Sequence, residues 1–285
     1  MISRGIETVT KGMMALLDYQ DVTAHNLANV TTDGYKKSNI TFQDVMQANI
    51  TTKTTEDKSR KVGTLSNGVR TDRTYIDFSQ GGLSETGNKT DLAFDGNGFF
   101  KVRFRDISDN APYNEKNYYY QRLGNFKLDT ENYLINNEGD YVMDTRNRRI
   151  RIARDQNATD INEMNRMEVG TDLIISETGQ IQLRNEGFST NLQTIQVVDF
   201  DDKTKVSQIG QSKFLPIYGQ DAGLHQLKVG EYSIQQGMLE MSNANTINEM
   251  LNTINISRGY ESMAKILKSE SDSIQQAVRV GNLGS

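Results

Sequence analysis

Few residues in this sequence have a type and a spacing that could support catalysis or bind a metal ion. His25 and His225 are the only histidines and cysteine is absent, so a zinc site would have to be built from carboxylates. No Gly-x-Ser-x-Gly turn occurs that would present a nucleophilic serine. His25 falls in a predicted helix beside Asn26, where a lone imidazole is typical of a capping or interface group. We therefore expect no catalytic residue, no metal site and no cofactor.

Carboxylates and one glycine-rich turn offer the remaining possibilities for chemistry. Asp199, Asp201 and Asp202 could supply a glycosidase pair, but carboxylates on a polar surface are usually solvated. The stretch from Asp129 lacks the glycine and the terminal glutamate of a calcium loop. The turn at residues 95–98 has no third glycine and no following Gly-Lys-Ser/Thr, so it does not fit a phosphate-binding loop. Nothing in the sequence favours an enzyme acting on cell-wall glycan.

Five arginines gather around a short predicted strand that contains Ile150 and Ile152. Alternation along a strand places Arg149 and Arg151 on the face opposite the two isoleucines. Three interpretations are open, namely a solvated face, salt links to a neighbouring subunit, and a polyanion site. The cluster comprises Arg146, Arg148, Arg149, Arg151 and Arg154.

The composition is that of a polar, mildly acidic chain. Its 285 residues have room for one large domain or two small ones. A hydrophobic content of 35 % and a mean hydropathy of -0.63 imply that much of the chain is surface, interface or linker. The net charge of -5 argues against nucleic-acid binding by phosphate neutralisation. We expect no membrane span, because no run of about 18 apolar residues occurs, and no signal peptide, because the first residues lack an apolar core.

The longest periodic stretch, from Ser242 to Gly281, predicts one amphipathic helix. Thr246 and Glu249 form a Thr-x-x-Glu capping box at its start, and Gly281 and Gly284, on either side of Asn282, suit its end. At about 1.5 Å per residue the helix would be roughly 50 Å long and would need a partner of similar length. Its apolar residues recur mostly at spacings of three and four, which predicts a single stripe. They are Ile247, Met250, Leu251, Ile254, Tyr260, Met263, Leu267, Ile274 and Val278.

The N-terminal segment predicts the partner helix. Its apolar residues step by four, three, four and three, which is the a/d spacing of a coiled coil, and Ala24 and Leu27 continue the pattern. They are Ile2, Ile6, Val9, Met13 and Leu16. We infer that the chain ends come together and that copies of the chain bury their remaining apolar residues against one another. Periodicity leaves open the alternative that both helices simply pack on a central domain.

Between the helices the periodicity becomes that of strands. The polar stretch from Thr51 to Lys61 is expected to be loop or disordered, and Asn67-Gly68 signals a hairpin-type turn. Phe100, Val102 and Phe104 alternate with Lys101 and Arg103, which predicts a half-buried strand. Short strands then recur to Phe200, with turns at residues 129–132, 137–140 and 176–179, and this pattern indicates an antiparallel β-domain.

Motifs near the two ends are similar to those of a known family. The N-terminal motif is Asn26-Leu27-Ala28-Asn29, then Thr31 and Gly34-Tyr35-Lys36. The C-terminal motif is Ser242-Asn243, then Glu249-Met250 and Arg258-Gly259-Tyr260-Glu261. Together they resemble the flagellar axial proteins, the rod and hook subunits of the bacterial flagellum, and the stretch from Asp91 to Phe100 is similar to the entry into their β-domain. The sequence departs from the family at Ser257, where Gln is common, and at Gly259, where Ala is usual, which puts the straightness of the helix near Gly259 in question.

The resemblance implies an α+β fold with long N- and C-terminal helices paired as a coiled coil, a central antiparallel β-domain and an extended linker arm. We expect the N-terminal helix within residues 1–34, the arm and linker at 35–90, the β-domain at 91–230 and the C-terminal helix within 231–285. The implied function is a structural subunit of the basal-body rod, in the periplasmic portion of the flagellum. It would polymerise through its terminal helices into the drive shaft that transmits torque from motor to hook.

The implied partners are copies of the chain itself, other rod and hook axial proteins and the flagellar export apparatus, with no nucleic acid. We expect the polymerisation interface to comprise Ile6, Val9, Met13, Leu16, Leu27, Ile247, Met250, Ile254, Tyr260, Met263, Leu267 and Ile274. A surface adhesin or binding module with a coiled-coil stalk and a β-head is the alternative. It predicts a closed oligomer of fixed size, whereas a rod subunit predicts open-ended assembly.

Overall fold

The computed structural model describes residues 2–45, 48–53, 59–65, 68–106, 117–152, 172–185, 188–210, 212–217 and 221–282. These residues form two compact units. Unit 1 combines Met1–Ala28, Ser38–Tyr75 and Asn245–Ser285, and unit 2 combines Asn29–Lys37 and Ile76–Ala244. Unit 1 therefore contains both ends of this sequence. Within the described ranges, no helix is both long and apolar enough to cross a membrane.

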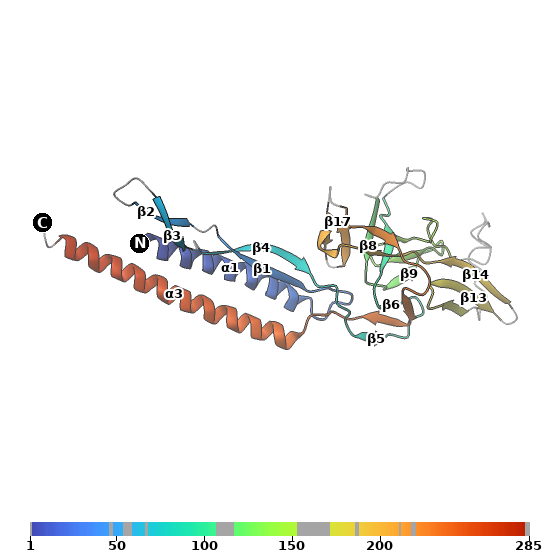
Figure 1. Ribbon diagram of the computed structural model, residues 1–285. Helices are drawn as coiled ribbons and strands as arrows, with labels where there is room; N and C mark the ends of the chain where they lie inside the picture. The colour runs from blue at the N-terminus through green and yellow to red at the C-terminus, as the bar shows by residue number, and fades with distance from the viewer. Residues whose placement is uncertain are drawn as a thin grey trace. The chain divides into compact units, whose positions relative to one another are not determined.

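The described part of unit 1 consists of two long helices and two strand pairs. α1 spans Ile2–Ala28 and α3 spans Thr246–Asn282. The strands are β1 (Ser38–Asp44), which pairs with β4 (Val69–Ile76), and β2 (Ala48–Lys53), which pairs antiparallel with β3 (Ser59–Leu65). Figure 1 shows α1 and α3 side by side, with β1 and β4 along α1. The two predicted terminal helices are thus confirmed.

α1 and α3 run antiparallel, with glycines at their contact points. A Cβ atom added to Gly12 would lie 3.0 Å from Cε of Met263, and one added to Gly5 would lie 2.8 Å from Oε1 of Glu270. From Gly5 to Gly12 the contact moves seven residues toward the C-terminus of α1. On α3 it moves seven residues toward the N-terminus, from Glu270 to Met263. Because glycine has no side chain, the two helix backbones can approach closely at these points.

α3 remains one continuous helix through Gly259. Gly259 lies against Leu16 of α1, where an added Cβ would be 3.3 Å from Leu16 Cδ1. The departure from the usual alanine therefore coincides with a close contact between the helices, and it does not break α3. Of the two glycines predicted to stop the helix, Gly281 is still part of α3, which extends to Asn282, and Gly284 lies outside the described residues.

The start of α3 differs from the predicted capping box. Oδ1 of Asn245 accepts hydrogen bonds from the backbone N–H groups of Ile247 (3.0 Å) and Asn248 (3.1 Å). Asn245 is therefore the N-cap, and Thr246, the predicted cap, is the first residue of the helix. Asparagine caps a helix at least as well as threonine. The sequence thus offers two adjacent candidates, and the spacing to Glu249 favoured the wrong one.

Unit 2 contains the predicted β-domain. Its strands are β5 (Leu83–Glu85), β6 (Leu92–Asp95), β7 (Phe99–Arg103), β8 (Tyr118–Gln121), β9 (Phe126–Leu128), β10 (Leu134–Asn136), β11 (Tyr141–Val142), β12 (Asp172–Ile175), β13 (Gln180–Asn185), β14 (Phe188–Thr194), β15 (Val197–Phe200), β16 (Val206–Ile209), β17 (Lys213–Pro216), β18 (Leu224–Gln226), β19 (Ser233–Gln236) and β20 (Met238–Glu240). A short 3-10 helix, η2 (Lys203–Lys205), follows β15.

The strands of unit 2 form antiparallel sheets. Over the described residues, the largest sheet has nine strands in the order β16-β17-β8-β7-β11-β10-β9, with β15 pairing with both β7 and β18. A second sheet is ordered β12-β13-β14, and β6 pairs with β19 and β5 with β20. Positive φ angles at Asn132 (62°), Gly139 (89°) and Gly179 (75°) confirm the three predicted turns.

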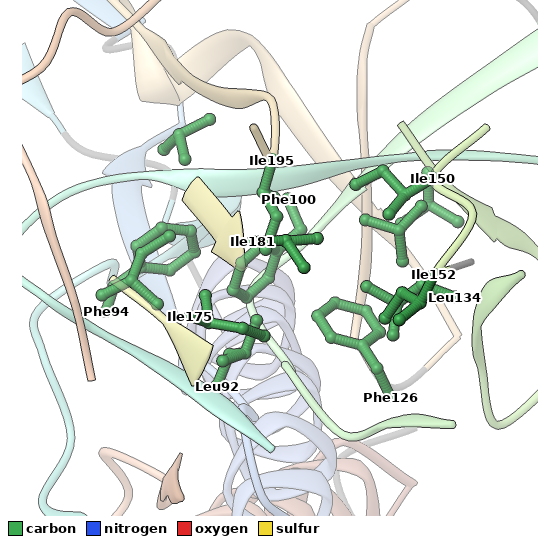
Figure 2. Close-up of a cluster of buried hydrophobic side chains, with 14 of the residues drawn as sticks. Leu92, Phe94, Phe100, Phe126, Leu134, Ile150, Ile152, Ile175, Ile181 and Ile195 are labelled. Atoms are coloured by element: carbon green, nitrogen blue, oxygen red, sulfur yellow. The ribbon is translucent and has the colours of Figure 1, made fainter. Parts of the chain in front are cut away.

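The core of unit 2 lies where side chains from separate sheets converge. Figure 2 shows Leu92 and Phe94 of β6 in the same cluster as Ile175 and Ile181 of the three-stranded sheet. Phe100 of β7 joins them, with its ring centroid 4.2 Å from that of Phe94. A second cluster contains Phe99, Phe200 and Phe214, and Phe78 packs edge-on against Phe99 and Phe214. These clusters close the β-domain around an apolar interior.

β7 is buried on both faces, so the predicted half-buried strand is wrong. Lys101 and Arg103, expected on a solvated face, are 2 % and 9 % exposed. The reason is the position of β7, which lies between β8 and β11 and also pairs with β15. Lys101 Nζ donates to Oδ1 of Asn147 (2.5 Å) and lies 4.4 Å from the ring centroid of Tyr118, so its charge is accommodated by polar and aromatic neighbours.

In the polar stretch from Thr51 to Lys61, the described residues form strands instead of the expected loop or disorder, and residues 54–58 lie outside the described residues. β2 includes Thr51 to Lys53, and β3 begins at Ser59. Asn67 of the predicted hairpin turn lies outside the described residues, and Gly68 has a φ of 104°. The strands on either side of this turn pair with β2 and β1, not with each other. Cross-strand pairing thus outweighs the weak strand propensity of this segment.

Replacing Gly34 by alanine should destabilise unit 2 by about 2–4 kcal/mol. In the turn after α1, Gly34 has a left-handed backbone, with a φ of 68°, and an added Cβ would lie 2.9 Å from Cα of Leu123. Gly87→Ala is the matched control, because Gly87 has a φ of 73° and its Cβ would meet nothing within 4 Å. Urea unfolding followed by tyrosine fluorescence measures both variants. Equal losses would contradict a role for the close approach to Leu123.

Candidate assembly interface

α3 carries its apolar side chains on two faces, so the single predicted stripe is wrong. Half-buried residues share the face of Met263, which contacts α1, and they are Tyr260, Met263, Leu267 and Ile274. Four exposed residues lie together on another face, namely Ile247, Met250, Leu251 and Ile254, each between 47 % and 69 % exposed. Ile266 and Val278 are also exposed, farther along α3. At about 100° per residue, the six-residue step from Ile254 turns Tyr260 about 120° away from Ile254, and the half-buried set as a whole points about 160° away from the exposed set.

α1 has fewer exposed apolar residues, and they are not the predicted ones. Met14 and Leu17 are exposed, whereas the predicted residues are half-buried, namely Ile6, Val9, Met13, Leu16 and Leu27. The cause is that α1 is covered from two sides. α3 covers one side, and on another the ring of Tyr19 packs edge-on against Phe42 of β1, with 6.0 Å between ring centroids. Met14 and Leu17 occupy the face that remains.

The N-terminal motif residue Asn26 joins α1 to β1 within unit 1. Its Oδ1 accepts from the backbone N–H of Ser38 (2.9 Å), and its Nδ2 donates to the carbonyl of Ser38 (2.8 Å). The side-chain amide thereby satisfies both backbone groups of the first residue of β1, as a neighbouring strand would. Asn26 is buried, so the pair of bonds is shielded from water. Ala28, which follows in the motif, is exposed.

The motif residues of unit 2 anchor the chain after the α1 turn. Asn29 accepts from Thr32 through both its carbonyl and its side-chain Oδ1, while Thr31 is exposed. The backbone N–H of Gly34 donates to the carbonyl of Glu240 (2.6 Å), and Tyr35 is fully buried. These contacts hold the segment against β20.

Asn243 of the C-terminal motif connects three backbone segments of unit 2. Its Oδ1 accepts from the N–H of Lys37 (2.7 Å), and its Nδ2 donates to the carbonyls of Asp77 (2.7 Å) and Ser79 (3.0 Å). Ser242 accepts the N–H of Ala244 through Oγ (3.1 Å). The Ser-Asn motif thus acts through backbone hydrogen bonds.

The remaining C-terminal motif residues lie on different faces of α3. Glu249 is buried, whereas Arg258 and Glu261 are exposed. The structure therefore brings Ser242, Asn243, Gly34 and Tyr35 together in unit 2, but it does not gather all motif residues at one place.

A buried carboxylate, Glu240, lies at the centre of the motif contacts in unit 2. Oε1 accepts from Nζ of Lys36 (2.7 Å) and from the N–H of Gly81 (2.9 Å), and Oε2 accepts from Nε of Arg122 (2.5 Å). Lys36 also donates to the carbonyl of Ser79 (2.7 Å). The two guanidinium NH2 groups of Arg122 donate to the carbonyls of Gly98 and Gly96. The charges are buried, yet each has several hydrogen-bond partners.

The charges around Glu240 shift its pKa and that of Lys36. Burial alone would raise the pKa of Glu240, but Arg122 and Lys36 together lower it below the ordinary range of a glutamate. Burial lowers the pKa of Lys36, and the attraction of Glu240 offsets this only in part. The carboxylate therefore stays ionised in the folded protein at neutral pH.

The arginine cluster makes contacts within the chain. Arg149 and Arg151 lie opposite the buried Ile150 and Ile152, as predicted. Arg149 lies 4.4 Å and 4.7 Å from two tyrosine ring centroids, those of Tyr133 and Tyr141. A separate pair joins Arg148 to Asp144 at 3.0 Å. Arg154 lies outside the described residues, and contact with a neighbouring subunit or a polyanion stays a prediction.

The residues considered for chemistry lie apart. His25 is exposed in the last turn of α1, and His225 is near Asp201, with 3.4 Å between Nδ1 and Oδ1. Asp199 is 3.2 Å from Lys203, and Asp202 caps η2. No group of three or more potential metal ligands occurs in the described part of the chain.

Several important residues escaped the sequence reasoning. Lys36 was recognised only as part of a motif, and nothing local indicates that Glu240 and Arg122 are its partners. Ile256 on α3 is 3 % exposed, and its burial could have been predicted from spacing. It lies seven residues after Glu249 and seven before Met263, so all three share one face of the helix. Gly5 and Gly12 share the same seven-residue spacing on α1.

Replacing Glu240 by glutamine should destabilise unit 2 by about 3–5 kcal/mol, because Lys36 and Arg122 would remain buried without their counter-charge. Glu138→Gln is the matched control. It removes the carboxylate from a more exposed pair with Lys213 and should cost about 0–1 kcal/mol. Urea unfolding at neutral pH compares the two. Similar small losses for both would contradict the central role of Glu240.

The stability of the wild type relative to Glu240→Gln should fall on acidification. The folded state holds the pKa of Glu240 below that of the unfolded chain, so the unfolded chain takes up the proton more readily. The stabilisation is therefore fully present above the ordinary glutamate pKa of about 4.3. It is lost as the pH falls through the lowered pKa. Urea midpoints measured at a series of pH values should show the two proteins converging in acid, and a constant difference would contradict the assignment.

Three protein-family models match separate segments of this chain. The model described as "Flagella basal body rod protein" matches residues 6–36. The model described as "Flagellar hook protein FlgE/F/G D1 domain" matches residues 93–183. The model described as "Flagellar basal body rod FlgEFG protein C-terminal" matches residues 235–280. The matches include α1, much of the β-domain and α3, in the same order.

Relatives align along nearly the whole chain. The flagellar basal-body rod protein FlgG of Borreliella burgdorferi is 28% identical over 273 residues, which cover 93% of this chain and 94% of that protein. FlgF of Caulobacter vibrioides is 29% identical over 271 residues, 95% of each chain. FlgG of Bacillus subtilis is 25% identical over 288 residues, 96% of this chain and 99% of that protein. These relatives give no support to the adhesin alternative. The chain belongs to the family of flagellar basal-body rod proteins, which are structural components of the flagellar basal body.

Proposed function

We propose that this rod subunit assembles with other copies of itself through the exposed apolar residues of unit 1. The observation that supports the proposal is that exposed large hydrophobic residues are concentrated in unit 1. Of the fourteen large hydrophobic residues that are exposed in the described ranges, ten lie in unit 1 and four in unit 2, although unit 2 holds more residues. Large exposed apolar patches mark surfaces that associate with other molecules. Unit 1 is therefore the part expected to be buried in the rod.

The exposed stripe of α3 supports this proposal most directly. Ile247, Leu251 and Ile254 recur at spacings of four and three, and Met250 lies among them. Such a stripe resembles one side of a helix interface. Contact with another copy would remove it from water, and burial of apolar surface contributes about 25 cal/mol per Å². In the proposed interface, these residues and the exposed Met14 and Leu17 face neighbouring subunits.

We propose that the half-buried residues hold α1 and α3 together as an antiparallel coiled coil. The contacts of Gly5 with Glu270 and of Gly12 with Met263 repeat after seven residues, which is the coiled-coil period. The proposed seam contains Ile6, Val9, Met13, Leu16, Leu27, Tyr260, Met263, Leu267 and Ile274. This pair would transmit torque along the rod, from motor to hook.

The proposed role is structural and not catalytic. Residues 1–34 and 231–285 would supply the helical part, residues 35–90 an arm and linker, and residues 91–230 the β-domain. The proposed partners are copies of the chain and other rod and hook axial proteins in the periplasmic portion of the basal body. As the family resemblance implies, the subunit would reach the rod through the flagellar export apparatus.

Replacing both Ile247 and Leu251 by asparagine should weaken self-assembly without unfolding the β-domain. The polar amides would have to lose water on contact with another copy. Sedimentation velocity over a range of concentrations should show open-ended growth for the wild type. For the variant, the same growth should need at least about tenfold more protein, which corresponds to a loss of about 1.4 kcal/mol of association free energy for each contact between subunits.

The double variant Ile209→Asn and Val229→Asn is the matched control. Both residues are exposed, 51 % and 68 %, but they lie in unit 2. This variant should assemble as the wild type does. A closed oligomer of fixed size, or equal losses for the two double variants, would contradict assembly through α3.

A further inference from the structure

Methionine side chains lie on the exposed faces of both helices of unit 1. Met14 of α1 is 61 % exposed and Met250 of α3 is 51 % exposed. Met143 in the β-domain is fully buried, and Met263 is half-buried against Gly12. The sequence contains no cysteine, so thioethers are its sulfur groups open to oxidation. The two methionines are thus both accessible and located on the proposed assembly faces.

We propose that Met14 and Met250 are sites of reversible oxidation by hydroperoxides, and that this oxidation blocks assembly of the subunit. In the reaction the hydroperoxide O–O bond breaks and one oxygen atom is transferred to the thioether sulfur. The thioether is oxidised to a sulfoxide, and the hydroperoxide is reduced to an alcohol, or to water when it is hydrogen peroxide. The inference rests on the proposed function, because it requires these side chains to be buried on assembly.

The surroundings of the two sulfur atoms explain why the sulfoxide would interfere. Met250 lies within the apolar stripe that contains Ile247 and Ile254, and Met14 lies one helical turn from the exposed Leu17. A sulfoxide is polar and accepts hydrogen bonds, so an apolar contact with another copy would leave its oxygen without a partner. Burial in the assembly would in turn shield the sulfur from peroxide. Oxidation would therefore act on the unassembled subunit.

The first test is oxidation with hydrogen peroxide, mapped by peptide mass spectrometry. In the dissociated subunit Met14 and Met250 should be oxidised readily, and the buried Met143 should be spared. Met241 is the internal control, because it is 47 % exposed but lies in unit 2, outside both helices. In the assembled protein the oxidation rates of Met14 and Met250 should fall at least about tenfold relative to that of Met241, as expected for accessibility-controlled oxidation. Equal rates before and after assembly would contradict the proposal.

The second test uses the variant Met14→Leu and Met250→Leu, which preserves side-chain volume and removes both sulfur atoms. After peroxide treatment, the wild type should assemble only at a protein concentration at least about tenfold higher. This shift corresponds to a loss of about 1.4 kcal/mol of association free energy for each contact between subunits. The treated variant should assemble normally. Methionine sulfoxide reductases supplied with a dithiol should restore the wild type, because the dithiol is oxidised to a disulfide while each sulfoxide is reduced to a thioether and its oxygen leaves as water. If peroxide treatment weakened the assembly of the wild type and of the variant equally, Met14 and Met250 would not be the oxidation sites that block assembly. A failure of the untreated wild type to assemble would instead contradict the proposed function.

Discussion

The ionised carboxylate of Glu240 is the interaction on which the architecture of unit 2 depends. It receives hydrogen bonds from Lys36, Gly81 and Arg122, which come from three segments far apart in the sequence. A buried charge costs several kcal/mol unless it is paired and hydrogen-bonded, so these segments must all be in place for any of them to be stable there. Asn243 adds neutral hydrogen bonds to the same region. The segment that follows α1 and the one that precedes α3 are thereby tied to the β-domain around the buried Glu240.

Unit 1 follows a different principle. Its helices meet through glycines and medium-sized residues, and much of its apolar surface remains in contact with water. A monomeric soluble protein would normally cover such a surface. In the proposed assembly, the uncovered faces form one half of an interface, and another copy of the chain supplies the other half. The proposed functional site is accordingly a surface formed by the exposed apolar side chains of α1 and α3.

Local periodicity was sufficient to predict the two terminal helices and the antiparallel β-domain, because 3.6-residue and 2-residue patterns are carried by adjacent residues. Local periodicity failed to predict which faces of the helices and strands are buried, because this depends on contacts between segments far apart in the sequence. The six-residue step from Ile254 to Tyr260 placed two apolar sets on different faces of α3, and the central position of β7 buried Lys101 and Arg103. The partners of Lys36 could not be predicted, because Glu240 lies about two hundred residues away in the chain. Periodicity identified the apolar residues of the two terminal helices, but it could not tell which of them pack between α1 and α3 and which are exposed; their role in assembly stays a prediction.

The antiparallel register of α1 and α3 has a consequence for how the length of this protein can change during evolution. An insertion or deletion within one helix displaces every contact beyond it, so that glycines no longer meet the bulky side chains opposite them. A change of about seven residues, close to two helical turns, would return the displaced residues to nearly the same face of the helix. Because α1 and α3 are far apart in the sequence, a shorter change in one helix would need a separate, matching change in the other to restore these contacts.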